Sequence, residues 1–188
     1  LSYIGILSIG MQLAESLWII SRSAASVQYA EISHAYNDEV KFDITYKTIR
    51  VSFFVTGLLL IPLLFIPDDF YTSVLGKDFN GLQQIILFLS PGILLYTIAV
   101  GISHYFSGTG IFIFNLISTL FAFVVTLAGG LIFITEYFHK GAAAVCSASY
   151  IAMAIALLFI FYRNHSLKWS ELFIRKNDIK SFLKKIQK

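Results

Sequence analysis

Residues 1–33 read LSYIGILSIGMQLAESLWIISRSAASVQYAEIS, a stretch that is apolar enough to enter a membrane and yet carries Glu15 and Arg22. Because a helix turns by about 100° per residue, the polar side chains of this stretch fall within about one third of its circumference. They are Ser8, Gln12, Glu15, Arg22, Ser26, Tyr29 and Ser33. The opposite side holds Ile6, Leu13, Leu17, Ile20, Ala24 and Val27. A polar face within a bilayer must turn toward protein or water, so we expect it to line a cavity.

The composition indicates an integral membrane protein. Of the 188 residues, 57% are hydrophobic and 13% are charged, whereas about 25% are charged in soluble domains. The single cysteine, Cys146, excludes an internal disulfide, and no Cys/His group has the spacing of a metal site. The sequence also contains no nucleophile elbow, HExxH motif, P-loop or dinucleotide fingerprint. We therefore expect no enzymatic activity, no catalytic residues, no metal and no cofactor.

Five segments are long enough to cross a hydrocarbon core of about 30 Å, which takes roughly 20 helical residues. Their limits are residues 3–33, 44–66, 82–107, 110–134 and 141–162. Only SGTG separates the third from the fourth, so these two form an antiparallel hairpin. The sequence predicts an all-α integral membrane fold, with a bundle of five transmembrane helices over residues 1–165.

The basic residues indicate how the chain is oriented, because Lys and Arg near the ends of spans stay on the cytoplasmic side. The loop and span edge at 34–50 carry three basic residues, whereas the alternate loops carry only Lys77 and Lys140. Residues 166–188 are rich in lysine and repeat apolar side chains at three- and four-residue spacing. This pattern predicts an amphipathic helix on an anionic membrane surface, with a cytoplasmic C-terminus and no role in binding nucleic acid.

The two charges of the first span are candidates for a substrate pathway. Glu15 and Arg22 share one face about 10 Å apart along the axis, so each should reach a partner on another helix or water. Holding one charge in a membrane costs about 2.5–3.5 kcal/mol, and such residues usually have a function. The guanidinium of Arg22 suits a phosphate or a carboxylate, and Glu15 suits a proton or a sodium ion. The alternative is a structural role for both.

Further polar residues complete the predicted substrate pathway. Gln12 and Ser26 lie on the same face as Arg22, and Thr97 and His104 share a face of the third span because they are seven residues apart. Asn115 begins a stripe of small side chains in the fourth span. The alternative for Thr97 and Asn115 is a hydrogen bond to a neighbouring helix or to backbone. For His104, near the cytoplasmic end of its span, the two alternatives are a hydrogen-bonded residue at the interface and a proton relay. Small residues in GAAAVCSASYIAMA, at the start of the fifth span, predict close helix packing.

Three stretches together resemble the C-terminal lobe of polysaccharide flippases, the Wzx-type O-antigen exporters of the multidrug/oligosaccharidyl-lipid/polysaccharide (MOP) exporter superfamily. They are YIGILSIGMQLAESLWIISRSAASVQYAEIS, GKDFNGLQQIILFLSPGILLYTIAVGISHYFSGTG and KGAAAVCSASYIAMAIALLFIFYRN. The resemblance is one of ordered pattern and covers nearly all of the chain up to about residue 165. The sequence departs from it at Ile20-Ser21 and Ala30-Glu31, where the family often has proline.

The resemblance implies a protein of two six-helix lobes that alternates between inward-open and outward-open states. Such a protein moves an undecaprenyl-diphosphate-linked oligosaccharide across the bacterial inner membrane for the synthesis of surface polysaccharide, including lipopolysaccharide. The five spans would be the last five of the second lobe, and an N-terminal lobe of the same protein would be their partner. Arg22 would contribute to a cationic cavity that meets the lipid diphosphate. Two alternatives stay open: an ion-coupled multidrug exporter of the same superfamily, and a membrane assembly subunit that transports nothing.

Overall fold

The computed structural model describes residues 2–164, so the amphipathic helix predicted at 166–188 lies outside the described residues. All the secondary-structure elements of residues 2–164 are helical, which confirms the predicted all-α fold. They are α1 (Ser2–Ser16), α2 (Trp18–His34), α3 (Asp38–Phe65), α4 (Asp68–Leu75), the 3-10 helix η1 (Lys77–Phe79), α5 (Leu82–Gly108), α6 (Ile113–Gly129), the π-helix η2 (Gly130–Ile134) and α7 (Thr135–Asn164).

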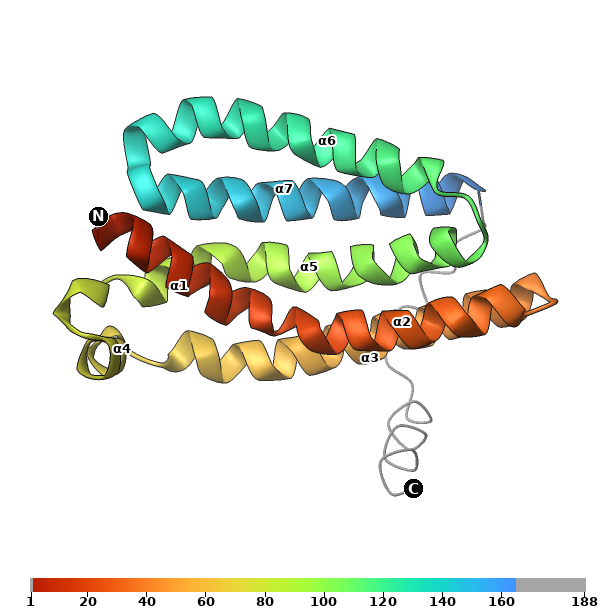
Figure 1. Ribbon diagram of the computed structural model, residues 1–188, viewed down its shortest axis with the longest axis horizontal. Helices are drawn as coiled ribbons and strands as arrows, with labels where there is room; N and C mark the ends of the chain where they lie inside the picture. Colours follow the sequence, from red (N-terminus) through yellow and green to blue (C-terminus); the bar gives the residue numbers. More distant parts are fainter. Residues whose placement is uncertain (1, 165–188) are drawn as a thin grey trace, which may run out of the picture.

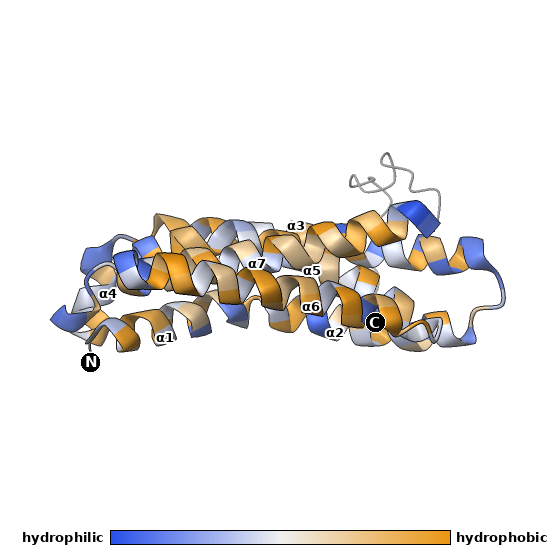
Figure 2. Cartoon of the chain, turned by 90° about the horizontal axis from the view of Figure 1, so that it is seen from above, coloured by the Kyte–Doolittle hydropathy of each residue, from blue (hydrophilic) through white to orange (hydrophobic). Residues whose placement is uncertain are grey.

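The long helices lie side by side along one axis, and the chain reverses direction at each end of the bundle (Figure 1). α1 and α2 follow one another in a single pass, and α5 lies at the centre, in contact with α1, α2, α3 and α7. α5 is mostly buried, whereas Ser118 is the one buried residue of α6 and most of its other side chains are exposed. Hydrophobic residues cover the length of the bundle and hydrophilic residues gather at its two ends (Figure 2), the distribution expected of helices in a bilayer.

Within residues 2–164, three helical runs are long and apolar enough to cross a membrane: α3, α5 and the run Ile113–Asn164. α1 and α2, which are bent by 41° at their break, make a fourth candidate if they form one crossing. The run Ile113–Asn164 turns back at Phe138, whose φ of 48° and ψ of −124° are not helical. Its two arms, α6 and α7, pack against each other (Figure 1). The division of the chain into five crossings remains a prediction.

The break between α1 and α2 forms at Leu17 without proline. The Ser16 hydroxyl donates to the Leu13 carbonyl at 2.7 Å, and the Leu17 N–H donates to Ala14 only three residues back, at 3.4 Å. Serine side chains that bond to the preceding turn bend helices. Ile20 and Ala30, at the positions where the resembling family often has proline, lie inside α2. The bend of this chain at Leu17 therefore forms without proline.

α5 remains continuous through Pro91 because two serines replace backbone hydrogen bonds. Proline cannot donate to the carbonyl four residues back, which is that of Leu87, and the Ser90 hydroxyl donates to this carbonyl at 2.8 Å. The Gly92 N–H donates to Ser147 Oγ of α7 at 3.0 Å. A Cβ on Gly92 would lie 2.7 Å from the Ser147 Cα. The close packing predicted for the small residues of the last helix is thus confirmed.

A buried stripe that patterning did not single out fixes the pass formed by α1 and α2. Its members are Ile6, Ala14, Trp18, Ser21, Ala25, Gln28 and Ile32. The stripe holds polar side chains that bond to other helices: Ser21 lies 3.3 Å from Thr56 of α3, and Gln28 donates to the Gly101 carbonyl of α5 at 2.8 Å. The polar face predicted from the sequence lies beside this stripe and remains largely exposed.

Candidate functional site

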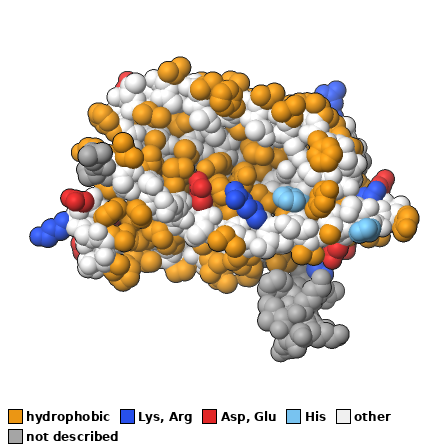
Figure 3. Space-filling model, viewed as in Figure 1, with side chains coloured by type: hydrophobic (Ala, Val, Ile, Leu, Met, Phe, Trp, Pro, Cys, Tyr) orange, Lys and Arg blue, Asp and Glu red, His pale blue; other side chains and the backbone are white. Residues whose placement is uncertain are grey.

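A cavity of about 380 Å³ lies between α2, α5 and α7. Its lining consists of Arg22, Ser26, Tyr96, Val100, Ser103, His104 and Met153. The cavity therefore brings together three predicted pathway residues, Arg22, Ser26 and His104, from helices that are far apart in the sequence. Figure 3 shows an acidic, a basic and a histidine side chain near the middle of one face, whereas the other charged side chains in view lie toward its ends.

Arg22 provides the positive charge of the cavity. Its guanidinium carbon lies 5.4 Å from the centroid of the Trp18 ring, and its side chain is exposed. Within residues 2–164 no carboxylate pairs with it. Ser26, one turn later, donates its hydroxyl to the Arg22 carbonyl at 3.0 Å. The N–H groups of the guanidinium are therefore left for water or a ligand.

His104 contributes a hydrogen-bonding group. Its Nδ1 lies 2.9 Å from the Val100 carbonyl of the preceding turn. A carbonyl only accepts hydrogen bonds, so Nδ1 donates to it and Nε2 is left for a further hydrogen bond. His104 is half-buried and Ser103 beside it lines the same cavity. The cavity thus offers a cation and several polar groups, a set that suits an anion with hydroxyl-bearing neighbours.

Three rings adjoin the cavity and connect it to Glu15. We define Trp18, Tyr96 and Tyr150, from α2, α5 and α7, as the aromatic cluster. The Trp18 centroid lies 4.3 Å from that of Tyr96 and 4.9 Å from that of Tyr150. Tyr150 donates its hydroxyl to Glu15 Oε1 at 2.7 Å. The expectation that Glu15 reaches a partner on another helix is confirmed, whereas Arg22 contacts a ring of its own helix.

The structure places the other predicted pathway residues outside the cavity lining. Gln12 is exposed and bonds to Ser8 of its own helix at 3.3 Å. Thr97 is buried and donates to the Leu94 carbonyl. Asn115 donates to the Ser103 carbonyl at 3.0 Å and to Ser107 Oγ at 2.9 Å, which joins α6 to α5. For Thr97 and Asn115, these contacts match the alternative to a pathway role, which was a hydrogen bond to backbone or to a neighbouring helix.

Sequence patterning missed four lining residues and the aromatic cluster. Ser103 immediately precedes a predicted residue, and Trp18 stands four residues before Arg22, a spacing that puts an aromatic ring beside a cation on a helix. These two signals were present in the sequence. Tyr96 and Met153 reach the cavity only through tertiary packing.

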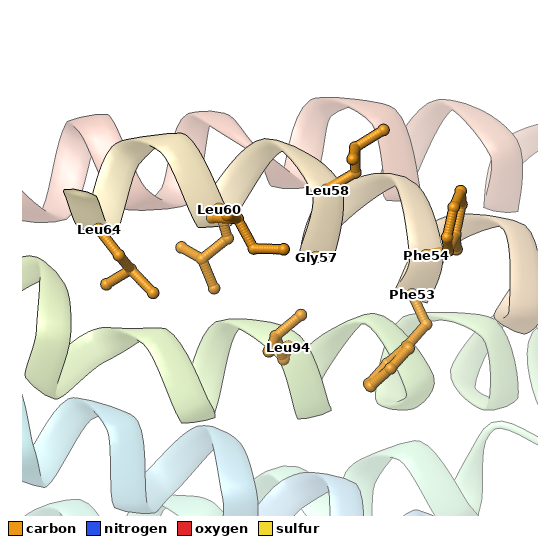
Figure 4. Close-up of a pocket in the computed structure, with 8 residues that line it drawn as sticks. Phe53, Phe54, Gly57, Leu58, Leu60, Leu64 and Leu94 are labelled. Carbon is orange, nitrogen blue, oxygen red and sulfur yellow. The ribbon is translucent and has the colours of Figure 1, made fainter. Parts of the chain in front are cut away.

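A second pocket, of about 360 Å³, lies between α3 and α5 and is apolar throughout (Figure 4). Its lining consists of Phe53, Phe54, Gly57, Leu58, Leu60, Ile61, Leu64 and Leu94. It offers no polar group for catalysis or for recognition. Among residues 2–164, no three His, Cys, Asp or Glu side chains lie close enough to hold a metal ion.

Comparison of the chain with family models, curated proteins and solved structures finds no match. The class of protein that the fold defines is an all-helical one with several membrane-length helices. The cavity around Arg22 is its most distinctive chemical feature.

Proposed function

We propose that this chain belongs to a membrane flippase that moves an undecaprenyl-diphosphate-linked oligosaccharide across the bacterial inner membrane for surface polysaccharide synthesis. The observation that supports this proposal is an exposed arginine in a cavity partway along a membrane-length pass. Arg22 lies about 18 Å along the helix axis from His34, where α2 ends. A hydrocarbon core is about 30 Å thick, so the guanidinium lies well inside it when the pass spans a bilayer.

A charge at this depth needs water, protein or an anionic ligand around it. A lipid diphosphate meets this need, because guanidinium and phosphate form paired, charge-assisted hydrogen bonds. Ser26, Ser103 and His104 would hydrogen-bond neighbouring oxygens of the phosphates or of the first sugar. The negative headgroup would then cross the membrane next to a positive charge.

In this proposal the described chain makes five crossings, with α1 and α2 together as the first and α6 and α7 as separate ones. A further helical lobe of the same protein covers the exposed face around Arg22. The segment 166–188 lies on the cytoplasmic surface in contact with anionic lipids. Support for the covering lobe comes from the exposure of Arg22 and Ser26, because neither suits contact with lipid tails.

The test is Arg22→Ala in the full-length protein, expressed in cells that lack the native copy. We expect normal abundance in the membrane and surface glycan reduced by at least about tenfold, since a lost charge-assisted bond to a charged group weakens binding by about 1.5–3 kcal/mol. Arg163→Ala is the matched control, because Arg163 is exposed at the end of α7. Normal glycan display by the Arg22 variant would contradict the proposal.

A multidrug exporter of the same superfamily is the second candidate, and the aromatic cluster beside Glu15 is the observation that favours it. Aromatic rings and a carboxylate together bind organic cations. In that case Arg22→Ala would leave drug export intact, whereas Glu15→Gln would abolish it. If instead the chain is an assembly subunit without transport activity, both variants would lower the amount of assembled protein.

A further inference from the structure

Trp18 is held in place from two sides. It is 4% exposed, and it lies against Tyr96 and, edge to face, against Tyr150. Its indole N–H has no hydrogen-bond partner among the described residues, so ring contacts fix its position. Tyr150 is itself restrained by its bond to Glu15. An indole packed in this way has one orientation and offers a rigid surface to a neighbouring group.

Arg22 uses that surface. It follows Trp18 by one helical turn, and its guanidinium carbon lies 5.4 Å from the ring centroid, within the range of a cation–π contact. The five N–H donors of a guanidinium lie in its plane, so contact with a ring face leaves them free. An unrestrained arginine side chain loses about 2 kcal/mol of rotamer entropy when it is fixed. Contact with Trp18 restrains the Arg22 side chain before a ligand binds, so less rotamer entropy is lost in the binding step.

The aromatic cluster also separates the two charges of the pass. The contacts run in series from Glu15 to Tyr150, from Tyr150 to Trp18, and from Trp18 to Arg22. The carboxylate is thus engaged with α7, and within residues 2–164 it forms no ion pair with Arg22. A guanidinium without a carboxylate partner keeps its full charge for an anion.

We infer that Trp18 is a positioning residue, which orients the Arg22 guanidinium for paired hydrogen bonds to a phosphate group of the ligand in this cavity. This inference rests on the proposed function, because it concerns recognition of the diphosphate by the same site. It assigns the aromatic cluster a role in binding an anion, in contrast to the direct binding of an organic cation.

The binding test uses the full-length protein in lipid nanodiscs, with inorganic diphosphate as the probe and calorimetry as the measurement. We expect Arg22→Ala to abolish binding, and Trp18→Leu to weaken it about fivefold, the size of one cation–π contact. Trp18→Phe should restore most of the affinity, because phenyl also provides a ring face. Phe159→Leu, a change of an exposed aromatic residue on α7, is the matched control and should bind normally.

The results separate the two proposals. If Arg22→Ala abolishes binding but the affinity of Trp18→Leu for diphosphate is within twofold of that of the unchanged protein, the positioning role of Trp18 is wrong. The proposed diphosphate site at Arg22 is then still supported. If diphosphate does not bind to the unchanged protein, or binds equally after Arg22→Ala, the proposed function fails and the inference fails with it.

A spectroscopic measurement covers the case in which Trp18→Leu does not fold. With the other tryptophans of the protein replaced by phenylalanine, the fluorescence of Trp18 reports the cation above its ring. We expect Arg22→Ala to change this emission, and diphosphate to change it only while Arg22 is present. Emission that is identical with and without Arg22 would overturn the inference.

Discussion

Gly92 determines how closely the two best-packed helices approach. Its backbone N–H donates to Ser147 Oγ, and a Cβ at this position would lie 2.7–2.8 Å from three atoms of Ser147. Two of these atoms are backbone, so a rotamer change cannot relieve the contact. The same glycine follows Pro91, where α5 has already lost one backbone hydrogen bond.

We predict that Gly92→Ala destabilises the protein by about 1–3 kcal/mol, the usual cost of an overpacked core. Thermal unfolding in detergent, followed by circular dichroism, measures the change. Gly57→Ala is the control, because its Cβ would meet only Leu94 at an ordinary 3.6 Å and alanine favours a helix over glycine by about 1 kcal/mol. Equal melting temperatures for the two variants would contradict the prediction.

At the level of single residues, periodicity predicted which side chains share one helix face but not which face another helix covers. Arg22 and Ser26 were found because they lie one turn apart on α2. The bond between Glu15 and Tyr150 joins residues 135 positions apart, and no spacing rule within one helix predicts such a pair. Thr97 carries the same polar signal as His104 and yet lies buried outside the cavity lining. Both residues bond to a carbonyl of their own helix, so what separates them is which face of α5 the neighbouring helices cover, and sequence alone does not show it.

At the scale of elements, Gln28 joins three helices. Its amide is 1% exposed and donates to Thr45 Oγ1 of α3 at 3.2 Å and to the Gly101 carbonyl of α5 at 2.8 Å. A buried amide in a membrane bundle that keeps such bonds specifies how its helices are arranged.

We predict that Gln28→Leu lowers the free energy of unfolding by about 0.6–1.7 kcal/mol, the range measured for hydrogen bonds between membrane helices. The matched control is Gln12→Leu, because Gln12 is exposed and bonds only within α1. Denaturant or thermal titration of the two purified variants provides the comparison. If Gln12→Leu lowers the free energy of unfolding as much as Gln28→Leu does, the hydrogen bonds of Gln28 to α3 and α5 do not contribute specifically to stability.

A tyrosine of the short helix α4 forms a hydrogen bond to the end of α3. Tyr71 is buried and donates its hydroxyl to the Leu63 carbonyl at 3.2 Å. Burial raises the pKa of this phenol above its ordinary value of 10.0, and the Asp68 carboxylate raises it further. The folded state therefore holds this proton more tightly than the unfolded state does.

The resulting stability is fully present below the unfolded pKa of about 10 and is lost as pH rises through the higher folded-state pKa. We predict that the melting temperature of the unchanged protein falls more steeply above pH 10 than that of Tyr71→Phe. Tyr36→Phe, which alters an exposed tyrosine, should follow the unchanged protein. Parallel curves for all three proteins would show that Tyr71 does not contribute.

Hydropathy predicted the ends of α5 more accurately than the start of α3. The segment predicted at 82–107 is α5, Leu82–Gly108, because apolar residues fill its whole length. The segment predicted at 44–66 begins at Asp38, because Asn37 caps the helix by accepting from the Glu39 N–H at 2.9 Å and two acidic residues follow in the first turn. A first turn that is stabilised by capping is polar, so a hydropathy pattern does not detect it.

At the scale of the whole molecule, two hydrophobic cores divide the bundle along its length. One centres on Ile49, Phe106 and Phe161 and the other on Trp18, Ile86 and Ile93. α5 passes through both, which explains why it is the most buried helix. The first pass runs from one core into the other, since Ala14 and Trp18 belong to one and Ile32 to the other. Tyr96, which lines the cavity with Arg22, packs against both cores.

The reversals of the chain are compatible with a topology in which successive passes alternate in direction across a membrane. The N-terminus, α4 and the turn between α6 and α7 lie at one end of the bundle, and the turn from α2 to α3 lies at the other (Figure 1). If each pass crosses the bilayer, these two groups of positions lie on opposite sides of the membrane. The excess of basic residues at 34–50 predicts that the turn from α2 to α3 lies in the cytoplasm.

Single cysteines test this topology in the full-length protein, in a background in which Cys146, together with any other native cysteine, is replaced by alanine. We predict that Asp78→Cys and Tyr137→Cys react with a membrane-impermeant maleimide in intact spheroplasts, whereas Tyr36→Cys reacts only after the membrane is permeabilised. All three side chains are exposed at turns, so access depends on the side of the membrane and not on burial. Labelling of Asp78→Cys without Tyr137→Cys would mean that α6 and α7 enter and leave on the same side without crossing. Equal labelling of Tyr36→Cys and Asp78→Cys in intact spheroplasts would show that α3 does not cross, and the placement of Arg22 inside the bilayer would then lose its basis.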